Sequence, residues 1–440
     1  MGTLPFTIRG LRRALAEEQT SPSALAEEAL ARANGNVGRN TYLWQNRAWT
    51  IAEAKRAESV RRGDGGEFGD GRAALWGLPI SVKDCFDLSG TPTSFGVRFY
   101  RDFNGAAAQD SWLVERLRAS GAIITGKTHL HPLAYGITGE NPEFGDCRQP
   151  GRPGVLTGGS SSGAAASVLE GSAVAAIGTD TGGSVRAPAA LCGLAGYRAS
   201  LGRGDWRGAG HLAQSFDTMG WLFRDLEDAP LLAGVLAPDD GKPAAAPARF
   251  AVVDAGFLHD CEPEIAAAME STARELEGLG LQRGTFESGW WADAYPAYAP
   301  IQAWEAARIH AGHFAHFPAP LPERLAWGAN ITDDEIATLR KRHAEFRARM
   351  DELLDAEKLL LMPATPVTQL AFGADHSHTR PRLLRYTTPF SMGGVPVVTI
   401  PAKAGGMQLA AARGNDEALV KIAARLGVQR KAMAQRSWSG

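Results

Sequence analysis

The sequence predicts an α/β fold, in which a β-sheet carries helices on its faces. Short apolar runs typical of buried strands alternate with helical segments from about residue 77 onward. The chain also holds 51 glycines in 440 residues, about 12% against the usual ~7%, which indicates many tight turns between such elements. A chain of this length is compatible with one large enzyme domain.

The N-terminal part is predicted to be helical, because residues 21–33 (SPSALAEEALARA) read as a capped amphipathic helix. A polar, Gly-rich loop follows at residues 61–72. Beyond it, apolar and β-branched runs predict strands with helices between them. We expect strands at residues 78–84, 121–128, 172–181, 359–366 and 395–401, and helices at residues 110–120 and 163–169 and in a short segment after residue 184.

Two of the later helices carry a start signal. Asp110 is predicted to be the N-cap of the helix over residues 110–120. Thr332 and Glu335 form a capping box ahead of a long helix. The apolar side chains of that helix recur at helical spacing, at Ile336, Leu339, Phe346, Met350 and Leu353.

The composition argues against several classes of protein. The 46 basic and 48 acidic residues give a net charge of −2, and no run of Lys and Arg could follow a phosphate backbone, so we expect no nucleic-acid partner. The four cysteines are scattered, and without a CxxC pair they indicate reduced thiols rather than a zinc ribbon. The first twenty residues lack the apolar core of a signal peptide, and no long apolar window is free of charge. We therefore expect a cytoplasmic protein without a membrane partner.

Residues 121–128 match the phosphate-loop pattern GxxxxGKT formally. A phosphate loop needs an open turn whose backbone N–H groups point inward. Here the intervening residues, Ala122 to Thr125, belong in a strand, and His129 and Pro132 make a poor helix start. We interpret the match as coincidental and expect no nucleotide.

Two Gly/Ser turns and one lysine carry the strongest chemical signal. The turns are residues 158–163 (GGSSSG) and 178–184 (GTDTGGS), and each opens a helix, where free N–H groups favour negative charge. A tight turn of this kind can aim several amides at one point, as an oxyanion hole requires. Lys83 ends a predicted strand, and burial can lower the pKa of a lysine enough for it to serve as a base for a serine.

In combination and in order, these segments resemble the amidase signature family, a group of Ser–cis-Ser–Lys hydrolases. The family's central pattern appears here as GGSSSGAAAS and GTDTGGSVRAPA, with Ser160 and Ser184 separated by the usual 24 residues. Its lysine strand appears as GLPISVKD, ending in Lys83 and Asp84. Outer motifs at residues 126–145, 215–229, 389–401 and 406–411 are similar as well, so that the likeness covers about residues 5–430.

The resemblance implies the site residues. Ser184 is expected to be the nucleophile, and Ser160, following a cis peptide bond after Gly159, the bridging serine. Lys83 is expected to be the base, neutral at rest. The oxyanion hole is assigned to the backbone amides of Thr181, Gly182, Gly183 and Ser184, and Asp180 and Arg186 are expected to support this turn.

The resemblance also implies the architecture: one amidase domain over residues 1–440, built on a large mixed β-sheet covered by helices on both faces. In it, a helical region spans about residues 1–60 and the catalytic motifs about residues 70–230, while the remainder completes the sheet and the substrate pocket. The implied activity is hydrolysis of a carboxylic amide or a related C–N acyl bond, such as an aryl amide, a urea or a carbamate (urethane). No cofactor is implied.

The pocket and the partners stay open. By resemblance, the pocket residues are expected to be Ala134, Tyr135, Gly136, Tyr298, Ile301 and Trp304. The sequence departs from the family at His129, Pro132 and Arg198, outside the three reacting residues. We expect a small-molecule substrate and a monomer or homodimer. The alternative is one component of an amidotransferase, which acts on charged tRNA beside partner proteins.

Two other chemistries are weaker. A Ser–His–Asp hydrolase would need a GxSxG elbow, which the sequence lacks despite its ten histidines. His310, His313 and His316 suggest a metal site, but their spacing turns the third residue away from the first, and no HExxH motif accompanies them. We therefore expect no metal, and a surface or pocket-lining role for these histidines.

Overall fold

The computed structural model describes residues 6–35, 40–63, 74–238 and 245–438. The strands are β1 (Tyr42–Trp44), β2 (Pro79–Lys83), β3 (Ile123–Thr128), β4 (Arg148–Gln149), β5 (Arg152–Leu156), β6 (Ala175–Asp180), β7 (Ala195–Arg198), β8 (Thr218–Phe223), β9 (Arg249–Val253), β10 (Gln282–Phe286), β11 (Lys358–Pro363), β12 (Leu370–Ala371), β13 (Val397–Pro401) and β14 (Gly406–Ala410). The helices are α1 (Ile8–Ala16), α2 (Pro22–Asn34), α3 (Arg47–Gly63), α4 (Arg98–Phe103), α5 (Trp112–Ala119), α6 (Ser162–Glu170), α7 (Arg186–Leu191), α8 (Ala229–Leu236), α9 (Pro263–Gly278), α10 (Ala294–Ile309), α11 (Leu321–Ala329), α12 (Asp333–Leu353), α13 (Thr379–Gly393) and α14 (Asp416–Trp438).

Within these residues, eleven strands form one mixed sheet in the order β1-β3-β2-β6-β8-β7-β13-β14-β11-β9-β10. Strands β3, β2 and β6 are parallel, as are β11, β9 and β10, whereas the strands between these groups pair antiparallel. The parallel group brings the ends of β2 and β6 to the same edge of the sheet. The two segments that carry Lys83 and Asp180 therefore end side by side.

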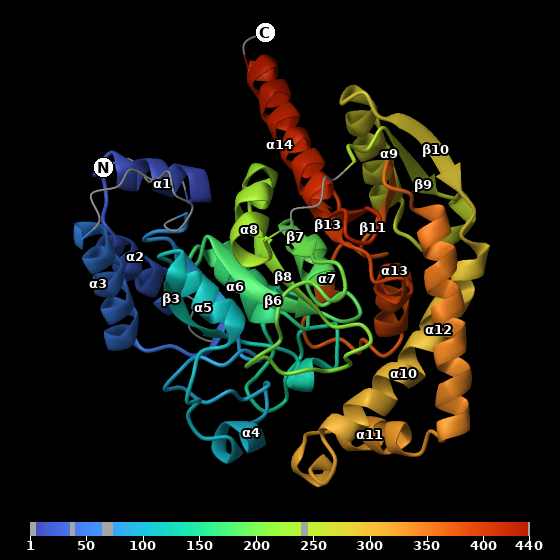
Figure 1. The fold of residues 1–440 in the computed structure, drawn as a ribbon, viewed down its shortest axis with the longest axis horizontal. Helices are drawn as coiled ribbons and strands as arrows, with labels where there is room; N and C mark the ends of the chain where they lie inside the picture. Colours follow the sequence, from blue (N-terminus) through green and yellow to red (C-terminus); the bar gives the residue numbers. More distant parts are fainter. Residues whose placement is uncertain (1–5, 36–39, 64–73, 239–244, 439–440) are drawn as a thin grey trace.

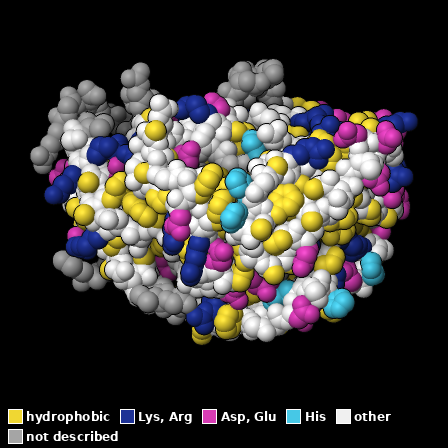
Figure 2. All heavy atoms as spheres, turned by 90° about the horizontal axis from the view of Figure 1, so that it is seen from below, with side chains coloured by type: hydrophobic (Ala, Val, Ile, Leu, Met, Phe, Trp, Pro, Cys, Tyr) yellow, Lys and Arg dark blue, Asp and Glu magenta, His cyan; other side chains and the backbone are white. Residues whose placement is uncertain are grey.

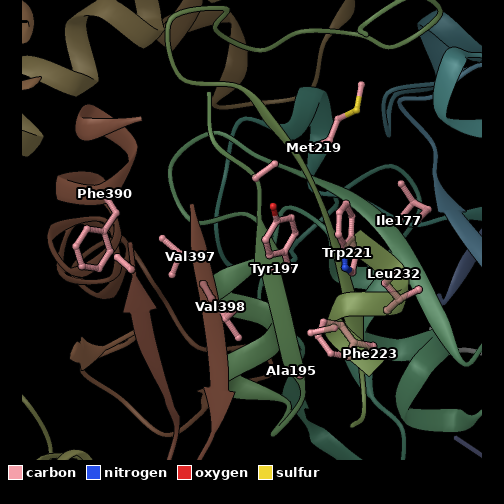
Figure 3. Close-up of a cluster of buried hydrophobic side chains, with 14 of the residues drawn as sticks. Ile177, Ala195, Tyr197, Met219, Trp221, Phe223, Leu232, Phe390, Val397 and Val398 are labelled. Carbon is pink, nitrogen blue, oxygen red and sulfur yellow. The ribbon is translucent and has the colours of Figure 1, made fainter. Parts of the chain in front are cut away.

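Helices cover both faces of the sheet, as the sequence predicts. Successive strand residues point to opposite faces. Ala176 and Leu222 pack with side chains of α6 and α7 in one apolar cluster, whereas Ile177, Trp221 and Phe223 belong to a second, larger cluster that includes Leu232 of α8. Figure 3 shows this second cluster, in which the rings of Tyr197 and Trp221 lie 4.4 Å apart.

The ribbon groups the elements by their position along the chain (Figure 1). Helices α1, α2 and α3 lie together at one side of the molecule, and β9, β10 and α9 lie at the other. Helices α11 and α12 both pack against α10, and α10 and α12 also pack against α13. This helical group places α10 and α13 where they contribute side chains to a common pocket.

Most elements lie where the sequence predicts them. The capped helix α2 begins after Ser21, whose side chain accepts a hydrogen bond from the Ala24 amide, and the capping box of Thr332 and Glu335 is present at α12. Residues 64–72 of the Gly-rich loop lie outside the described residues.

The predicted N-cap at Asp110 is wrong, because α5 begins after Ser111. Asp110 instead accepts a hydrogen bond from the Ser89 amide and forms an ion pair with Arg118 at 2.8 Å. These competing partners hold the carboxylate of Asp110 away from the helix end.

The surface bears charges of both signs. On the face shown in Figure 2, Lys and Arg side chains are scattered among Asp and Glu side chains and do not gather in one field. Within the described residues, every helix is too short or too polar to cross a lipid bilayer.

Candidate active site

Lys83 lies at the end of β2 with its side chain fully buried. Its Nζ atom lies 2.8 Å from Ser160 Oγ and 2.8 Å from Thr179 Oγ1. In the described part of the chain, no carboxylate forms an ion pair with this amine. Burial lowers the pKa of Lys83 from its usual 10.5, and the more distant charges of Asp180 and Asp217 offset this effect only in part. The site therefore favours the neutral amine, which can accept a proton.

The carboxylate of Asp84, the residue after Lys83, does not pair with Lys83. Asp84 pairs with the buried Lys127 at 2.6 Å and accepts a hydrogen bond from the Ser94 amide at 3.2 Å. Lys127 also donates to the carbonyl of Pro92 and to Thr93. The lysine of the phosphate-loop match is thus a buried structural cation within strand β3, and no phosphate loop is formed there.

Ser160 lies in the loop between β5 and α6 and follows a cis peptide bond after Gly159. The Gly159 amide donates to the Ile137 carbonyl at 2.8 Å. The next residue joins the two Gly/Ser turns, because the Ser161 amide donates to the Ser184 carbonyl at 3.1 Å. The structure therefore brings Lys83, Ser160 and the Ser184 turn together.

Ser184 lies in the turn between β6 and α7 and lines a small pocket. Its Oγ is not hydrogen-bonded to Ser160 Oγ in this structure, although the backbones of the two turns are linked. Of the two hydroxyl contacts that a Lys–Ser–Ser relay requires, the contact between Lys83 and Ser160 is formed.

Asp180 organises the Ser184 turn. Its carboxylate accepts hydrogen bonds from the amides of Gly183, Val185 and Arg186, and it pairs with the guanidinium groups of Arg186 and Arg198, both at 2.8 Å. Burial alone would raise the pKa of Asp180, but the two arginines and the amide donors hold it well below its usual value. The carboxylate is thus ionised, and it fixes the turn from behind.

The Gly183 amide is consequently already engaged by Asp180 Oδ1, at 2.9 Å. The amides of Thr181, Gly182 and Ser184 have no hydrogen-bond partner among the described residues. The side chain of Thr181 donates to Asp217 at 2.6 Å, and Thr387 donates to the Gly182 carbonyl, so that the orientation of this peptide segment is fixed. Three unpaired amides and one engaged amide therefore make up the predicted donor group.

Gly182 is packed too closely for a side chain. A Cβ atom at this position would lie 2.3 Å from the hydroxyl oxygen of Tyr298. That hydroxyl accepts a hydrogen bond from Gln302 at 2.6 Å, and burial raises the pKa of Tyr298 well above its usual value, so the phenol is neutral. Glycine is the residue that lets the turn approach α10.

Four of the six predicted pocket residues line the pocket beside Ser184, namely Ala134, Tyr135, Gly136 and Tyr298. Ile301 and Trp304 do not line it: Ile301 is fully buried, and Trp304 packs under the guanidinium of Arg308, 3.3 Å from its ring centre. The sequence prediction missed Ile137, Gln302, Arg380 and Leu384, which complete the lining. Gln302 follows Tyr298 by one helical turn, and this spacing is a signal that could have identified it.

The free space in this pocket is about 10 Å³, close to that of one water molecule. A substrate therefore enters only when lining side chains move.

The histidines considered above have structural partners. His129 contacts Ser162 Oγ through Nδ1 and the Gly145 carbonyl through Nε2, and burial lowers its pKa to about 4. His310 contacts the Tyr100 hydroxyl at 2.8 Å, and His316 stacks on Phe99. Among the described residues, no three His, Cys, Asp or Glu side chains gather in a group that could hold a metal ion.

Comparisons with known proteins show what this chain is similar to. Residues 25–420 match the family model described as Amidase. The chain is 26% identical to a glutamyl-tRNA(Gln) amidotransferase component from Koribacter versatilis (strain Ellin345), over 95% of this chain and 97% of that protein. It is 30% identical to AtzE, a component of 1-carboxybiuret hydrolase from Pseudomonas sp. (strain ADP), over 91% of this chain and 94% of that protein.

A solved structure described as an amidase superposes with a TM-score of 0.85 at 30% identity, covering 96% of this chain and 99% of that chain. The family match spans the turns that carry Ser160 and Ser184 and the strand that carries Lys83. The chain therefore belongs to the amidase signature family of enzymes, which act on C–N bonds.

Proposed function

We propose that this protein hydrolyses a carboxylic amide or a related C–N acyl bond, with Ser184 as nucleophile, Ser160 as bridge and Lys83 as base. The observation that carries the proposal is the 2.8 Å contact between Lys83 Nζ and Ser160 Oγ, made by a buried amine whose pKa is lowered. A neutral amine in this position can act as a general base and take the proton of the Ser160 hydroxyl.

The relay moves one proton at each step. Lys83 takes the proton of Ser160, and Ser160 takes the proton of Ser184 as Ser184 Oγ attacks the acyl carbon. Collapse of the tetrahedral intermediate breaks the C–N bond, and the leaving amine takes a proton from Ser160, which recovers one from Lys83. Water then hydrolyses the acyl-enzyme through the same relay. The contact between Ser184 and Ser160 is the one that has to form on substrate binding, when catalytic hydrogen bonds commonly tighten.

The amides of Thr181, Gly182 and Ser184 would stabilise the negative charge on the acyl oxygen. They are fixed in place before the reaction because Asp180 and Thr387 hold the turn. Donors held in position in this way need no reorganisation as charge develops. The Gly183 amide donates its hydrogen bond to Asp180, so it would support the turn and contribute least to stabilising the oxyanion.

Ala134, Tyr135, Gly136 and Tyr298 would form the wall against which the substrate is held. Primary amides, aryl amides, ureas and carbamates (urethanes) all suit the same relay. The hydrolase relative named above supports hydrolysis in preference to transfer. No metal or other cofactor takes part in these steps.

A hydrolysis screen tests the proposal directly. Primary amides, anilides, ureas and carbamates are offered to the wild type and to the Ser184→Ala, Ser160→Ala and Lys83→Met variants. We expect release of amine by the wild type and a loss of about 10⁴-fold or more in each variant, because the three groups act as a unit. Undiminished turnover in any one of these variants would exclude the relay.

A second function calls for its own test, because the match to an amidotransferase component extends over 95% of the chain. In that case the relay would release ammonia from an amide donor for use by a partner protein. Glutamine-dependent ammonia release that rises on addition of a co-purifying partner would favour it. Full turnover of simple amides by the isolated chain would favour hydrolysis.

A further inference from the structure

Arg380 is a pocket-lining cation without an acidic partner. It lies in the first turn of α13 and lines the pocket together with Ser184 and Gly182. Its Nε atom is buried and has no hydrogen-bond partner. Among the described residues, no carboxylate forms an ion pair with its guanidinium.

Four other arginines near this pocket are paired. Arg382 and Arg385, on the same helix, both contact Asp260, at 3.1 and 2.8 Å. Arg186 and Arg198, behind the Ser184 turn, share Asp180. Buried or half-buried cations in proteins are normally paired in this way, because removing the charge from water is unfavourable. The unpaired Arg380 is an exception beside the nucleophile.

A second guanidinium strengthens the positive potential. Arg324 of α11 donates to the Tyr135 carbonyl at 3.1 Å, on the wall of the same pocket. Burial lowers the pKa of Arg324 to about 10, and the charge of Arg380 contributes to the shift, so the two cations are close enough to repel each other. No ion pair within the described residues neutralises Arg324. A bound anion would relieve this repulsion.

His131 adds a neutral polar group on the same side. Its Nδ1 is buried without a hydrogen-bond partner, and a Cβ added at the pocket residue Gly136 would lie 2.1 Å from its Nε2. Burial holds the pKa of His131 well below its usual value, and Arg324 and Arg380 lower it further. The imidazole is therefore neutral and adds no charge to that of the two guanidinium groups.

We propose that the pocket selects amides that carry a carboxylate at the end remote from the scissile bond, and that Arg380 binds that carboxylate. Arg324 supplies additional positive potential. This inference rests on the proposed amide hydrolysis and names its substrate class. A guanidinium suits the role because its N–H groups match the two oxygens of a carboxylate.

The test uses matched substrates. Amic acids with one to four methylene groups between carboxylate and amide are compared with neutral isosteres in which a methyl group replaces the carboxylate oxygen. Succinamic acid is thus compared with 4-oxopentanamide. We expect the wild type to favour the best amic acid by about 10- to 100-fold in kcat/KM, the range of a charged hydrogen bond.

Three variants separate binding from folding. Arg380→Gln should raise KM for the amic acid by about 10- to 100-fold and leave its kcat within about threefold, whereas kcat/KM for the isostere should fall by less than about threefold. Arg380→Lys should restore part of the preference. The matched control is Arg342→Gln on α12, where an exposed side chain undergoes the same loss of charge; it should behave as wild type.

The outcomes are distinct. Equal turnover of amic acids and isosteres by the wild type, or an equal loss for both in Arg380→Gln, would overturn the inference while amide hydrolysis stands. Turnover confined to other amides, with no amic acid accepted, would overturn it as well. Absence of turnover for every amide would instead count against the proposed function itself.

Discussion

The amine of Lys83 lies 2.8 Å from the hydroxyl of Ser160, 77 positions away in the sequence. β2 delivers the lysine at its end, and the loop before α6 delivers the serine. The amine is fully buried, and no carboxylate of the described residues forms an ion pair with it. Burial therefore lowers the pKa of Lys83, and the amine that contacts Ser160 binds a proton less tightly than an ordinary lysine does. This relationship leads to the first two predictions.

The rate should rise with pH and level off below pH 10.5. Lys83 acts as a base only when neutral, and its pKa is lowered from 10.5 by burial. The rising limb of kcat/KM should therefore lie at a lower pH than that of an ordinary lysine, and Lys83→Met should abolish it. A pH–rate profile on a neutral substrate measures this. An unchanged rising limb in the residual activity of Lys83→Met would point to another base.

Lys83→Met should stabilise the protein while inactivating it. The folded pKa lies below the unfolded value, so the unfolded chain binds more protons at neutral pH and the wild type gains stability as pH rises toward 10.5. Methionine removes this dependence. Thermal melting of both proteins from pH 7 to pH 10 should show a higher Tm for the variant, with a gap that narrows as pH rises. A constant gap, or a less stable variant throughout, would contradict the assignment of a buried neutral amine.

Gly182→Ala should reduce kcat/KM by about 100-fold, the scale of a lost oxyanion donor. The new methyl group would lie 2.3 Å from the Tyr298 hydroxyl and would displace the turn. Tyr298→Phe removes that oxygen, so the double variant should recover part of the loss. Gly154→Ala is the matched control, since a Cβ at Gly154 meets nothing within 4 Å. Full activity in Gly182→Ala would show that the turn tolerates displacement.

Asp180→Asn should cost about 3–5 kcal/mol of unfolding free energy, as breaking a buried ion pair commonly does. The substitution leaves Arg186 and Arg198 buried without a charged partner. Asp355→Asn, which breaks an exposed pair with Arg249, should cost less than about 1 kcal/mol. Urea denaturation of both variants measures the contrast. Equal losses would mean that the buried cluster has no special weight in stability.

The sequence predicted the positions of Lys83, Ser160 and Ser184 in the fold better than it predicted the lining of the pocket. Ser160, Ser184 and Lys83 lie in local Gly/Ser turns and at a strand end, and such short motifs carry their own geometry. The strands and helices around these residues could be predicted as well, because apolar periodicity is also a local property of the sequence. The predicted N-cap at Asp110 is wrong because its carboxylate is engaged by Ser89, 21 positions earlier, and by Arg118 near the end of α5, and the local capping pattern does not reveal these partners.

The pocket depends on how distant helices pack. Arg380 and Leu384 come from α13, about 200 residues after Ser184, and no local pattern marks them. On α10, the residues that line the pocket are Tyr298 and Gln302, one turn apart, whereas Ile301 and Trp304 do not line it. The sequence does not show which side of α10 meets the pocket, because that depends on how the helix is placed relative to the Ser184 turn.

The most direct measurement of the central claim is site mapping of a fluorophosphonate adduct by mass spectrometry. The proposed relay predicts a single adduct on Ser184 in the wild type, much slower labelling in Lys83→Met, and none in Ser184→Ala despite an unchanged circular dichroism spectrum. An adduct on another residue, or labelling of Ser184 at the same rate without Lys83, would contradict it.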